Sequence, residues 1–268
     1  MTTSAGPRVV VVIGGKGGVG KTTVAAGLAF ALGRRFRVGL VDMDLSGPSV
    51  PVLLGVEGPP PVRDGRMVPP RATADGIEVP VMSTGLFGTP DSAFGWQGPV
   101  VRGVLRQFVR DVDWGPLDHL VVDTPPGVGE LHAAVLDALS PVAAVAVTTA
   151  DAAALADTRR SLRWFRDVLP VAAVVHNRAG TVCGACGTSD RAGGEDAAAV
   201  AALAGDVPVI GLPAVVGSRH PWRAGPEAGA AWEELASLVH TWPDARGTGD
   251  SPAAHRHEPA PAGRGGRS

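Results

Sequence analysis

A glycine-rich stretch near the amino terminus has the residue types and spacing of a phosphate-binding loop. Residues 15–22, GKGGVGKT, match the pattern G-x-x-x-x-G-K-[ST] between an expected strand and an expected helix. Glycines let successive backbone N–H groups turn toward phosphate oxygens, and the helix adds the positive end of its dipole. The pattern therefore predicts ATP binding by Gly15, Lys16, Gly17, Gly18, Val19, Gly20, Lys21, Thr22 and Thr23.

The two lysines of this loop are the only lysines in the chain. The chain has 24 lysines and arginines in total, and the other 22 are arginines. We therefore expect that a guanidinium group cannot replace the ammonium group at Lys16 or Lys21. Lys21 is predicted to contact the β- and γ-phosphates, and Thr22 to offer its hydroxyl to Mg²⁺. An ordinary phosphate loop needs no cation at Lys16, so this charge is spare unless a second phosphate contact exists.

Carboxylates follow two of the expected strands. Asp42 and Asp44 end the run LVDMD and lie on the same side of an extended backbone, where they can serve Mg²⁺ and a water molecule. The alternative is a pair of solvated side chains at a strand end. Asp123 ends HLVVD, the Walker B arrangement in which a carboxylate contacts Mg²⁺ through water. The TPPG segment that follows is expected to be a loop that senses the γ-phosphate.

The only two cysteines, Cys183 and Cys186, are separated by two residues in the segment AGTVCGACGTSD. A four-thiolate zinc or iron–sulfur site needs two more ligands than one chain offers. Four alternatives are open: a cluster bridging two chains, a mononuclear zinc site completed by His176 and another residue, a redox dithiol, and two thiols without a chemical role.

Short apolar runs alternate with helical stretches along the chain. Runs rich in Val and Ile predict strands buried on both faces, and the segments between them are long enough for crossover helices. We therefore predict an α/β fold with a doubly wound, mostly parallel sheet flanked by helices. The expected strands are 8–13, 37–42, 77–83, 117–123, 142–149, 171–177 and 207–212. The expected helices are 21–33, 98–111, 129–139, 152–168, 195–204 and 227–240.

Composition bounds the domain organisation and the partners. The 268 residues are enough for one large domain, predicted over 1–243, with a Pro/Gly-rich insertion at about 55–76 holding at most a small hairpin. Residues 244–268 lack apolar periodicity and are expected to be a disordered tail. The net charge of −2 gives no general attraction to nucleic acid or to membrane. No signal peptide or membrane-spanning stretch is recognisable, so a cytoplasmic location is expected.

The loop sequence KGGVGKT resembles the deviant Walker A loop of MinD/ParA-like P-loop ATPases. The segments VDMDLSGPSVP, VMSTGLF, VVDTPPGVGE and CGAC occur in the order typical of the Mrp/ApbC/NBP35 family of iron–sulfur cluster carriers, and the match covers about 8–225. The resemblance implies an ATPase that holds a [4Fe-4S] cluster between the two subunits of a homodimer. It also implies transfer of that cluster to apo-proteins.

The same resemblance implies roles for individual residues. Lys16 reaches the partner's nucleotide, Asp44 orients or deprotonates the attacking water, and Asp42 supports the metal. Asn177 reads the adenine ring. Lys16, Lys21 and Asp44 are thus the predicted catalytic residues, Thr22, Asp42 and Asp123 the Mg²⁺ residues, and Cys183 and Cys186 the cluster ligands.

The chain departs from the family pattern at several positions. It has Gly184 where a proline is usual, Gln97 in place of arginine, Arg178 in place of methionine, and Ala214 where an acidic residue is usual. These changes affect the cluster environment more than the phosphate loop. The alternatives are therefore a MinD/ParA-like positioning ATPase, an electron-transferring reductase, or a paralogue that binds ATP but no cluster.

Overall fold

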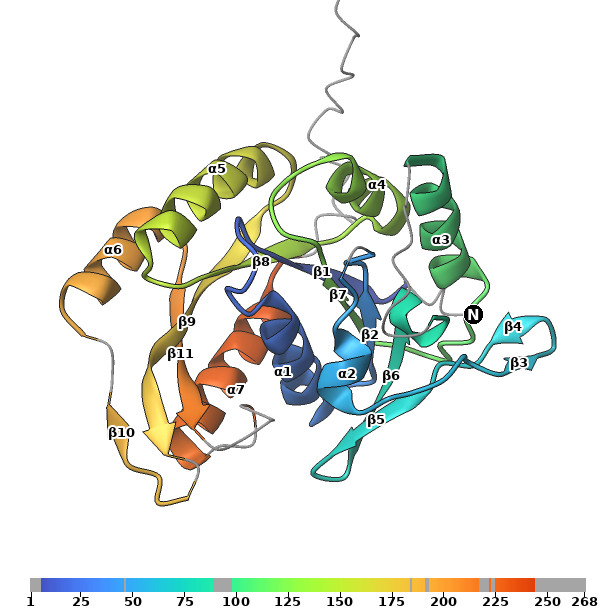
Figure 1. The fold of residues 1–268 in the computed structure, drawn as a ribbon, viewed down its shortest axis with the longest axis horizontal. Coiled ribbons are helices and arrows are strands. Elements are labelled where there is room, and N and C mark those ends of the chain that lie inside the picture. The colour runs from blue at the N-terminus through green and yellow to red at the C-terminus, as the bar shows by residue number, and fades with distance from the viewer. Residues whose placement is uncertain are drawn as a thin grey trace, which may run out of the picture.

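The structure is a computed structural model that describes residues 6–45, 47–88, 98–183, 185–190, 193–216, 222 and 225–243. Its centre is a nine-stranded sheet in the order β10-β9-β8-β1-β7-β2-β6-β5, with β11 also paired to β9 (Figure 1). The sheet strands are β1 (Arg8–Ile13), β2 (Val38–Asp42), β5 (Arg71–Ala74), β6 (Ile77–Ser83), β7 (His119–Asp123), β8 (Ala143–Thr148), β9 (Val171–Cys183), β10 (Ser189–Asp190) and β11 (Val209–Val216). A separate hairpin pairs β3 (Val62–Arg63) with β4 (Arg66–Met67).

The inner strands are parallel because helices cover both faces of the sheet. β1 lies between β7 and β8, and β7 lies between β1 and β2, all in parallel register. Every residue of β2, β7 and β8 is buried, as expected for strands without a solvent face. Antiparallel pairs occur where β5 joins β6 and where β10 joins β9. The carboxyl ends of β1, β2 and β7 therefore meet at one edge of the sheet.

The helices form two layers (Figure 1). One layer packs with the core that includes Val10, Val12 and Leu40, and contains α1 (Lys21–Gly33), α2 (Val50–Leu54) and α7 (Gly225–Thr241). The opposite layer contains α3 (Gly98–Arg110), α4 (Glu130–Leu139), α5 (Ala152–Val168) and α6 (Glu195–Ala204). A single turn of 3-10 helix, η1 (Thr84–Leu86), follows β6. None of the described helices is both long and apolar enough to cross a bilayer.

The predicted α/β class and the mostly parallel sheet are confirmed, and the expected strands and helices are present with end shifts of a few residues. Two differences matter. Part of the expected insertion, residues 71–74, is an edge strand of the sheet, and its four residues, which alternate between exposed and buried, are too few to have predicted it. The strand expected at 171–177 continues to Cys183, because β10 and β11 pair with its second half. The expected tail lies outside the described residues, and the single domain over 1–243 stays a prediction.

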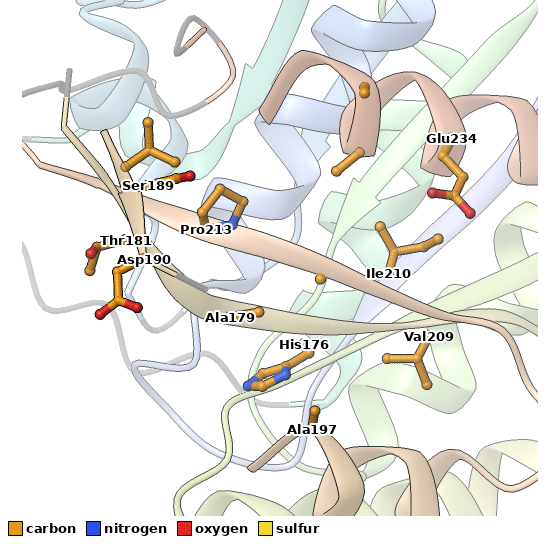
Figure 2. Close-up of a pocket in the computed structure, with 14 residues that line it drawn as sticks. His176, Ala179, Thr181, Ser189, Asp190, Ala197, Val209, Ile210, Pro213 and Glu234 are labelled. Carbon is orange, nitrogen blue, oxygen red and sulfur yellow. The ribbon is translucent and has the colours of Figure 1, made fainter. Parts of the chain in front are cut away.

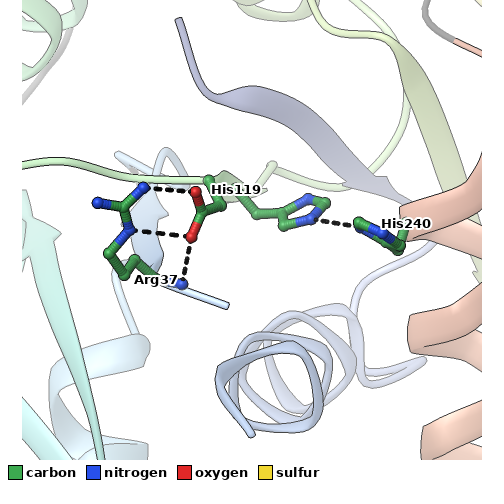
Figure 3. A network of polar contacts seen from close by, with 4 residues as sticks. Arg37, His119 and His240 are labelled. Atoms are coloured by element: carbon green, nitrogen blue, oxygen red, sulfur yellow. Dashed lines mark hydrogen bonds and ion pairs between the residues drawn. The ribbon is translucent and has the colours of Figure 1, made fainter. Parts of the chain in front are cut away.

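A polar network lies at the amino end of β7 (Figure 3). Arg37 donates three hydrogen bonds to the Asp118 carboxylate, and these bonds lower the pKa of Asp118 to about 2. The next residue, His119, is 1% exposed, and its Nε2 lies 3.2 Å from His240 Nδ1 on α7. Phe36 stacks on the His240 ring at 4.1 Å. The network fastens the last helix to the base of the sheet.

This network predicts a loss of stability in mild acid. Burial, with the charges of His240 and Arg8, lowers the pKa of His119 to about 4. Between pH 6.5 and 4 the unfolded chain therefore binds a proton at His119 that the folded protein excludes, and the contribution of His119 to stability falls as the pH falls. His119→Gln is expected to reduce the loss between pH 7.5 and 5 by about 2 kcal/mol, measured by urea unfolding. An unchanged pH dependence in this variant would contradict the assignment.

Candidate functional site

The phosphate loop joins β1 to α1 at the carboxyl edge of the sheet. Gly18 and Gly20 adopt φ angles of 80° and 95°, which side chains other than glycine rarely tolerate. A Cβ at Gly15 would lie 2.1 Å from the backbone of Asp157 on α5, so this position has no room for a side chain. Helix α1 begins at Lys21 directly after the loop, so its first N–H groups lie at the loop. The loop has the backbone that an anion cradle requires.

The two lysines of the loop lie in different environments. Lys21 is 6% exposed, and burial lowers its pKa while the charges of Asp123 and Asp44 raise it. Lys16 is exposed, and within the described part of the chain it makes no hydrogen bond or ion pair. Lys21 therefore belongs to the chain's own polar cluster, whereas Lys16 is directed to solvent.

Asp42 and Asp123 end the neighbouring strands β2 and β7, and the two residues are paired in register. Asp42 is fully buried and accepts hydrogen bonds from Ser83 Oγ at 3.0 Å, from the Val50 amide at 3.1 Å and from the Asp44 amide at 3.1 Å. Burial nevertheless raises the pKa of Asp42 to about 6. Its carboxylate thus organises the turn after β2, a role that the sequence did not indicate.

The carboxylate of Asp123 is buried and, within the described part of the chain, lacks hydrogen-bond donors. Its two oxygens are inaccessible, and neither has a hydrogen-bond partner among the residues that the structure describes. Burial raises the pKa of Asp123 to about 8, and the Asp42 charge adds to the rise, while the nearby Thr22 hydroxyl and Lys21 oppose it. Unpaired buried carboxylates are costly, and a cation resolves the cost. The site therefore fits Mg²⁺, which commonly uses one carboxylate, a hydroxyl and phosphate oxygens.

Two serines near this cluster were missed by the sequence analysis. Ser49 Oγ lies 3.3 Å from Thr22 Oγ1, and Ser83 Oγ donates to Asp42. Ser49 belongs to the segment GPS that supported the family resemblance, which was the only signal for it. Ser83 ends β6, the strand next to β2, and adjacent strand ends could have indicated it.

The loop after β7 contacts the phosphate loop. Thr124 Oγ1 donates to the Val12 carbonyl at 2.8 Å, and the Gly127 amide donates to the Gly14 carbonyl at 2.8 Å. The segment expected to sense the γ-phosphate is therefore attached to the first residue of the glycine-rich turn.

The cysteines lie in a hairpin at the end of β9. The Cys183 amide donates to the Thr188 carbonyl at 2.9 Å, and the Gly187 amide donates to the Cys183 carbonyl at 2.8 Å. Cys186 is exposed, and its thiol lies 3.2 Å from Thr188 Oγ1, a contact that lowers the pKa of Cys186 to about 7. Gly184 lies outside the described residues. Both thiols are thus presented on one short turn, with Cys183 half-buried.

Two residues in the middle of β9 contact the phosphate loop. Asn177 Nδ2 donates to the Val19 carbonyl at 2.7 Å, and Arg178 Nη2 donates to the Gly18 carbonyl at 3.0 Å. A Cβ at Gly20 would lie 2.1 Å from Asn177 Nδ2, so glycine is needed for this approach. The adenine role of Asn177 stays a prediction. The contact of Arg178 was not expected from the sequence.

A hollow of about 400 Å³ lies beside the cysteine hairpin (Figure 2). His176 and Ala197 lie on one side of β9 and β11, whereas Ile210 and Glu234 lie on the other side. Asp190 lies near the opposite end of the view from Glu234, so the polar groups do not converge on one point. The hollow is separate from the phosphate loop, and no three His, Cys, Asp or Glu side chains gather as a metal site among the described residues.

Two solved structures that resemble this chain contain a bound nucleotide. A nucleotide-binding protein from Archaeoglobus fulgidus in complex with ADP is 28% identical, with a TM-score of 0.61 over 88% of this chain and 89% of that chain. The septum site-determining protein MinD from Pyrococcus horikoshii, complexed with Mg-ADP, is 23% identical, with a TM-score of 0.56 over 87% of this chain and 96% of that chain. The second likeness shows that the two proteins share a fold.

Curated relatives are closer in sequence. The human cytosolic Fe-S cluster assembly factor NUBP2 is 41% identical over 77% of this chain and 79% of its own length. An iron-sulfur cluster carrier protein from Pseudomonas fragi is 41% identical over 70% of this chain and 66% of its own length. A family model described as ParA, NUBPL iron-transfer P-loop NTPase, matches residues 7–216. The chain therefore belongs to the family of NUBPL-type iron-transfer P-loop NTPases.

Proposed function

We propose that the protein is an ATP-hydrolysing carrier of a [4Fe-4S] cluster, held between two subunits and passed to apo-proteins. The observation that carries the proposal is the combination of two sites on one strand. β9 contacts the phosphate loop through Asn177 and Arg178 and ends at Cys183. Family membership supports the cargo, because relatives are named as assembly factors and carriers of iron–sulfur clusters. The name of the human relative also supports a cytosolic location.

ATP and Mg²⁺ would be held by the residues already described. The loop N–H groups and Lys21 neutralise phosphate oxygens, and Thr22 and Asp123 hold the ion. Asp42 positions the turn that carries Asp44 by accepting the Asp44 amide. Asp44 is partly exposed beside Lys21 and can orient a water for in-line attack on the γ-phosphorus. Mg²⁺ would neutralise charge that develops on the phosphate oxygens.

A dimer is supported by two features of a single subunit: the solvent-directed Lys16 and a cysteine pair that supplies only half of the ligands of a cluster. Lys16 is a solvent-directed cation on the phosphate loop, which suits contact with a nucleotide on a facing subunit. Cys183 and Cys186 provide two thiolates, whereas a cubane cluster takes four. A symmetric dimer supplies both missing contributions through one interface, because every residue that crosses it does so twice.

Anaerobic reconstitution with iron and sulfide tests the proposal. The wild type is expected to hold about two iron atoms per subunit, as one cluster shared by a dimer, with Cys183→Ala retaining less than a tenth of that amount. Ser189→Ala is the matched control, since Ser189 is an exposed residue of the same hairpin. Equal iron content in the wild type and in Cys183→Ala would contradict cluster binding by this pair.

A further inference from the structure

Arg178 has a backbone conformation that neither a turn nor a helix end explains. Among the described residues, four that are not glycine have positive φ: Asp64, Asp75, Ser140 and Arg178. The two aspartates each precede a glycine in a hairpin turn, and Ser140 caps α4. Arg178, with φ 61°, instead lies within β9, at the irregularity where its register with β11 shifts between Asn177 and Thr181. Left-handed backbone at such a residue is strained, and the surrounding contacts must maintain it.

Arg178 and its neighbour Asn177 each donate a hydrogen bond to a backbone carbonyl of the phosphate loop. Arg178 holds the Gly18 carbonyl, and Asn177 holds the Val19 carbonyl. Because a trans peptide is planar, each carbonyl points opposite to the N–H of the following residue. The N–H groups of Val19 and Gly20 therefore point away from β9. A charged donor on the carbonyl also strengthens the N–H at the other end of that peptide as a donor.

β11 links Asn177 to the first cysteine, because it pairs with Asn177 and again with residues 181–183, and its register with β9 shifts between these two stretches. Residues 181 and 182 pair with β10 on one side and with β11 on the other, and β11 also pairs with Cys183. The Cys183 amide and carbonyl then close the thiol hairpin. A change at Asn177 therefore has a route to the thiols through β11, which is paired with β9 on both sides of the irregularity.

We propose that Arg178 is a positioning residue that aligns the phosphate cradle and couples its occupancy to the Cys183–Cys186 hairpin. The inference rests on the proposed function in that a nucleotide phosphate fills the loop. A bound phosphate would hold the N–H groups of Val19 and Gly20 in place. The carbonyls of the same two peptides, which accept from Arg178 and Asn177, would then be held as well, and with them this part of β9. Coupling is reciprocal, so a change at the thiols alters nucleotide affinity by the same factor.

Two substitutions of Arg178, by glycine and by methionine, separate the effect of its side chain from the effect of its backbone conformation. Arg178→Gly keeps the left-handed conformation at no steric cost and removes the guanidinium, so its unfolding midpoint is expected to be equal to or above that of the wild type. Arg178→Met removes the guanidinium but retains the strain. Arg178→Lys retains charge without the planar donor and is expected to restore part of the effect. Arg71→Met, at an exposed arginine on the distant strand β5, is the matched control.

Two measurements test the coupling on the full chain without iron: the Kd for Mg·ATP, and the rate at which iodoacetamide alkylates Cys186 with and without Mg·ATP. We expect nucleotide to slow alkylation of the wild type and of Arg71→Met at least about fivefold. Arg178→Gly and Arg178→Met are expected to bind Mg·ATP about tenfold more weakly and, at saturating nucleotide, to lose most of this protection.

Full protection in both Arg178 variants at saturating nucleotide would overturn the coupling while leaving ATP binding intact. The coupling would also be overturned if Cys186 of the wild type were alkylated at the same rate with and without bound Mg·ATP. A wild type that does not bind Mg·ATP would overturn the proposed function itself, and the coupling with it.

Discussion

Asp123→Asn is expected to raise the free energy of unfolding while it weakens Mg²⁺-dependent nucleotide binding. The pKa of Asp123 is raised by burial, with Asp42 adding to the rise, so between pH 4 and 8 the folded protein holds a proton that the unfolded chain releases. The contribution of Asp123 to wild-type stability therefore falls as the pH rises through this window. The neutral amide removes this cost, and the gain is expected to grow from near zero at pH 4 to on the order of 2 kcal/mol at pH 8.

Urea unfolding and nucleotide titration measure the two effects on the same protein. The Kd for Mg·ATP is expected to rise at least about tenfold at pH 8, because the ion loses its anionic ligand. Asp206→Asn, at an exposed carboxylate, is the control and should leave both quantities unchanged. A variant that is less stable than the wild type at pH 8 would contradict an unpaired carboxylate at this position.

Lys16→Gln is expected to lower the rate of ATP hydrolysis by about 10³-fold while ATP affinity changes less than about threefold, because a cation supplied in trans acts mainly on the transition state. Lys16 is exposed and makes no hydrogen bond or ion pair within the described part of its own chain, so removing its charge should not disturb the fold. Steady-state kinetics and nucleotide titration separate the two effects.

Mixing two inactive variants tests whether Lys16 acts on the partner. Lys16→Gln retains Lys21, and Lys21→Ala retains Lys16, so a mixed dimer contains one complete site. With random pairing, the mixture is expected to reach about a quarter of wild-type activity, since half of the dimers have one of two sites. A mixture no more active than its separate components would place Lys16 in its own subunit's site.

Local sequence predicted the phosphate loop and most of the sheet, because both depend on neighbours in the chain. The loop needs glycine at Gly18 and Gly20 for positive φ, and the inner strands need unbroken apolar runs. The sequence also predicted that Asp42 and Asp123 serve the same Mg²⁺ ion. The two residues lie side by side because parallel strands present their carboxyl ends at the same edge of the sheet. The role of Asp42 in holding the Val50 and Asp44 amides did not follow, because it depends on how the chain turns after β2.

Contacts between distant segments were beyond the sequence patterns. Arg178 contacts the phosphate loop from a left-handed position within β9, and nothing in VVHNRAG predicts that conformation. His119 and His240 meet across 121 positions of the chain. The short strand β5 has small side chains with alternating burial, too weak a pattern to distinguish it from the loop before it. These features depend on tertiary packing.

Native mass spectrometry of the anaerobically reconstituted protein shows whether two chains share one cluster through four thiols. We expect a species of twice the chain mass of 27.2 kDa that carries four iron and four sulfide, and we expect Cys186→Ala to lack it. A reconstituted protein that remains a single chain, or a dimer whose iron content is the same without Cys186, would contradict a shared cluster.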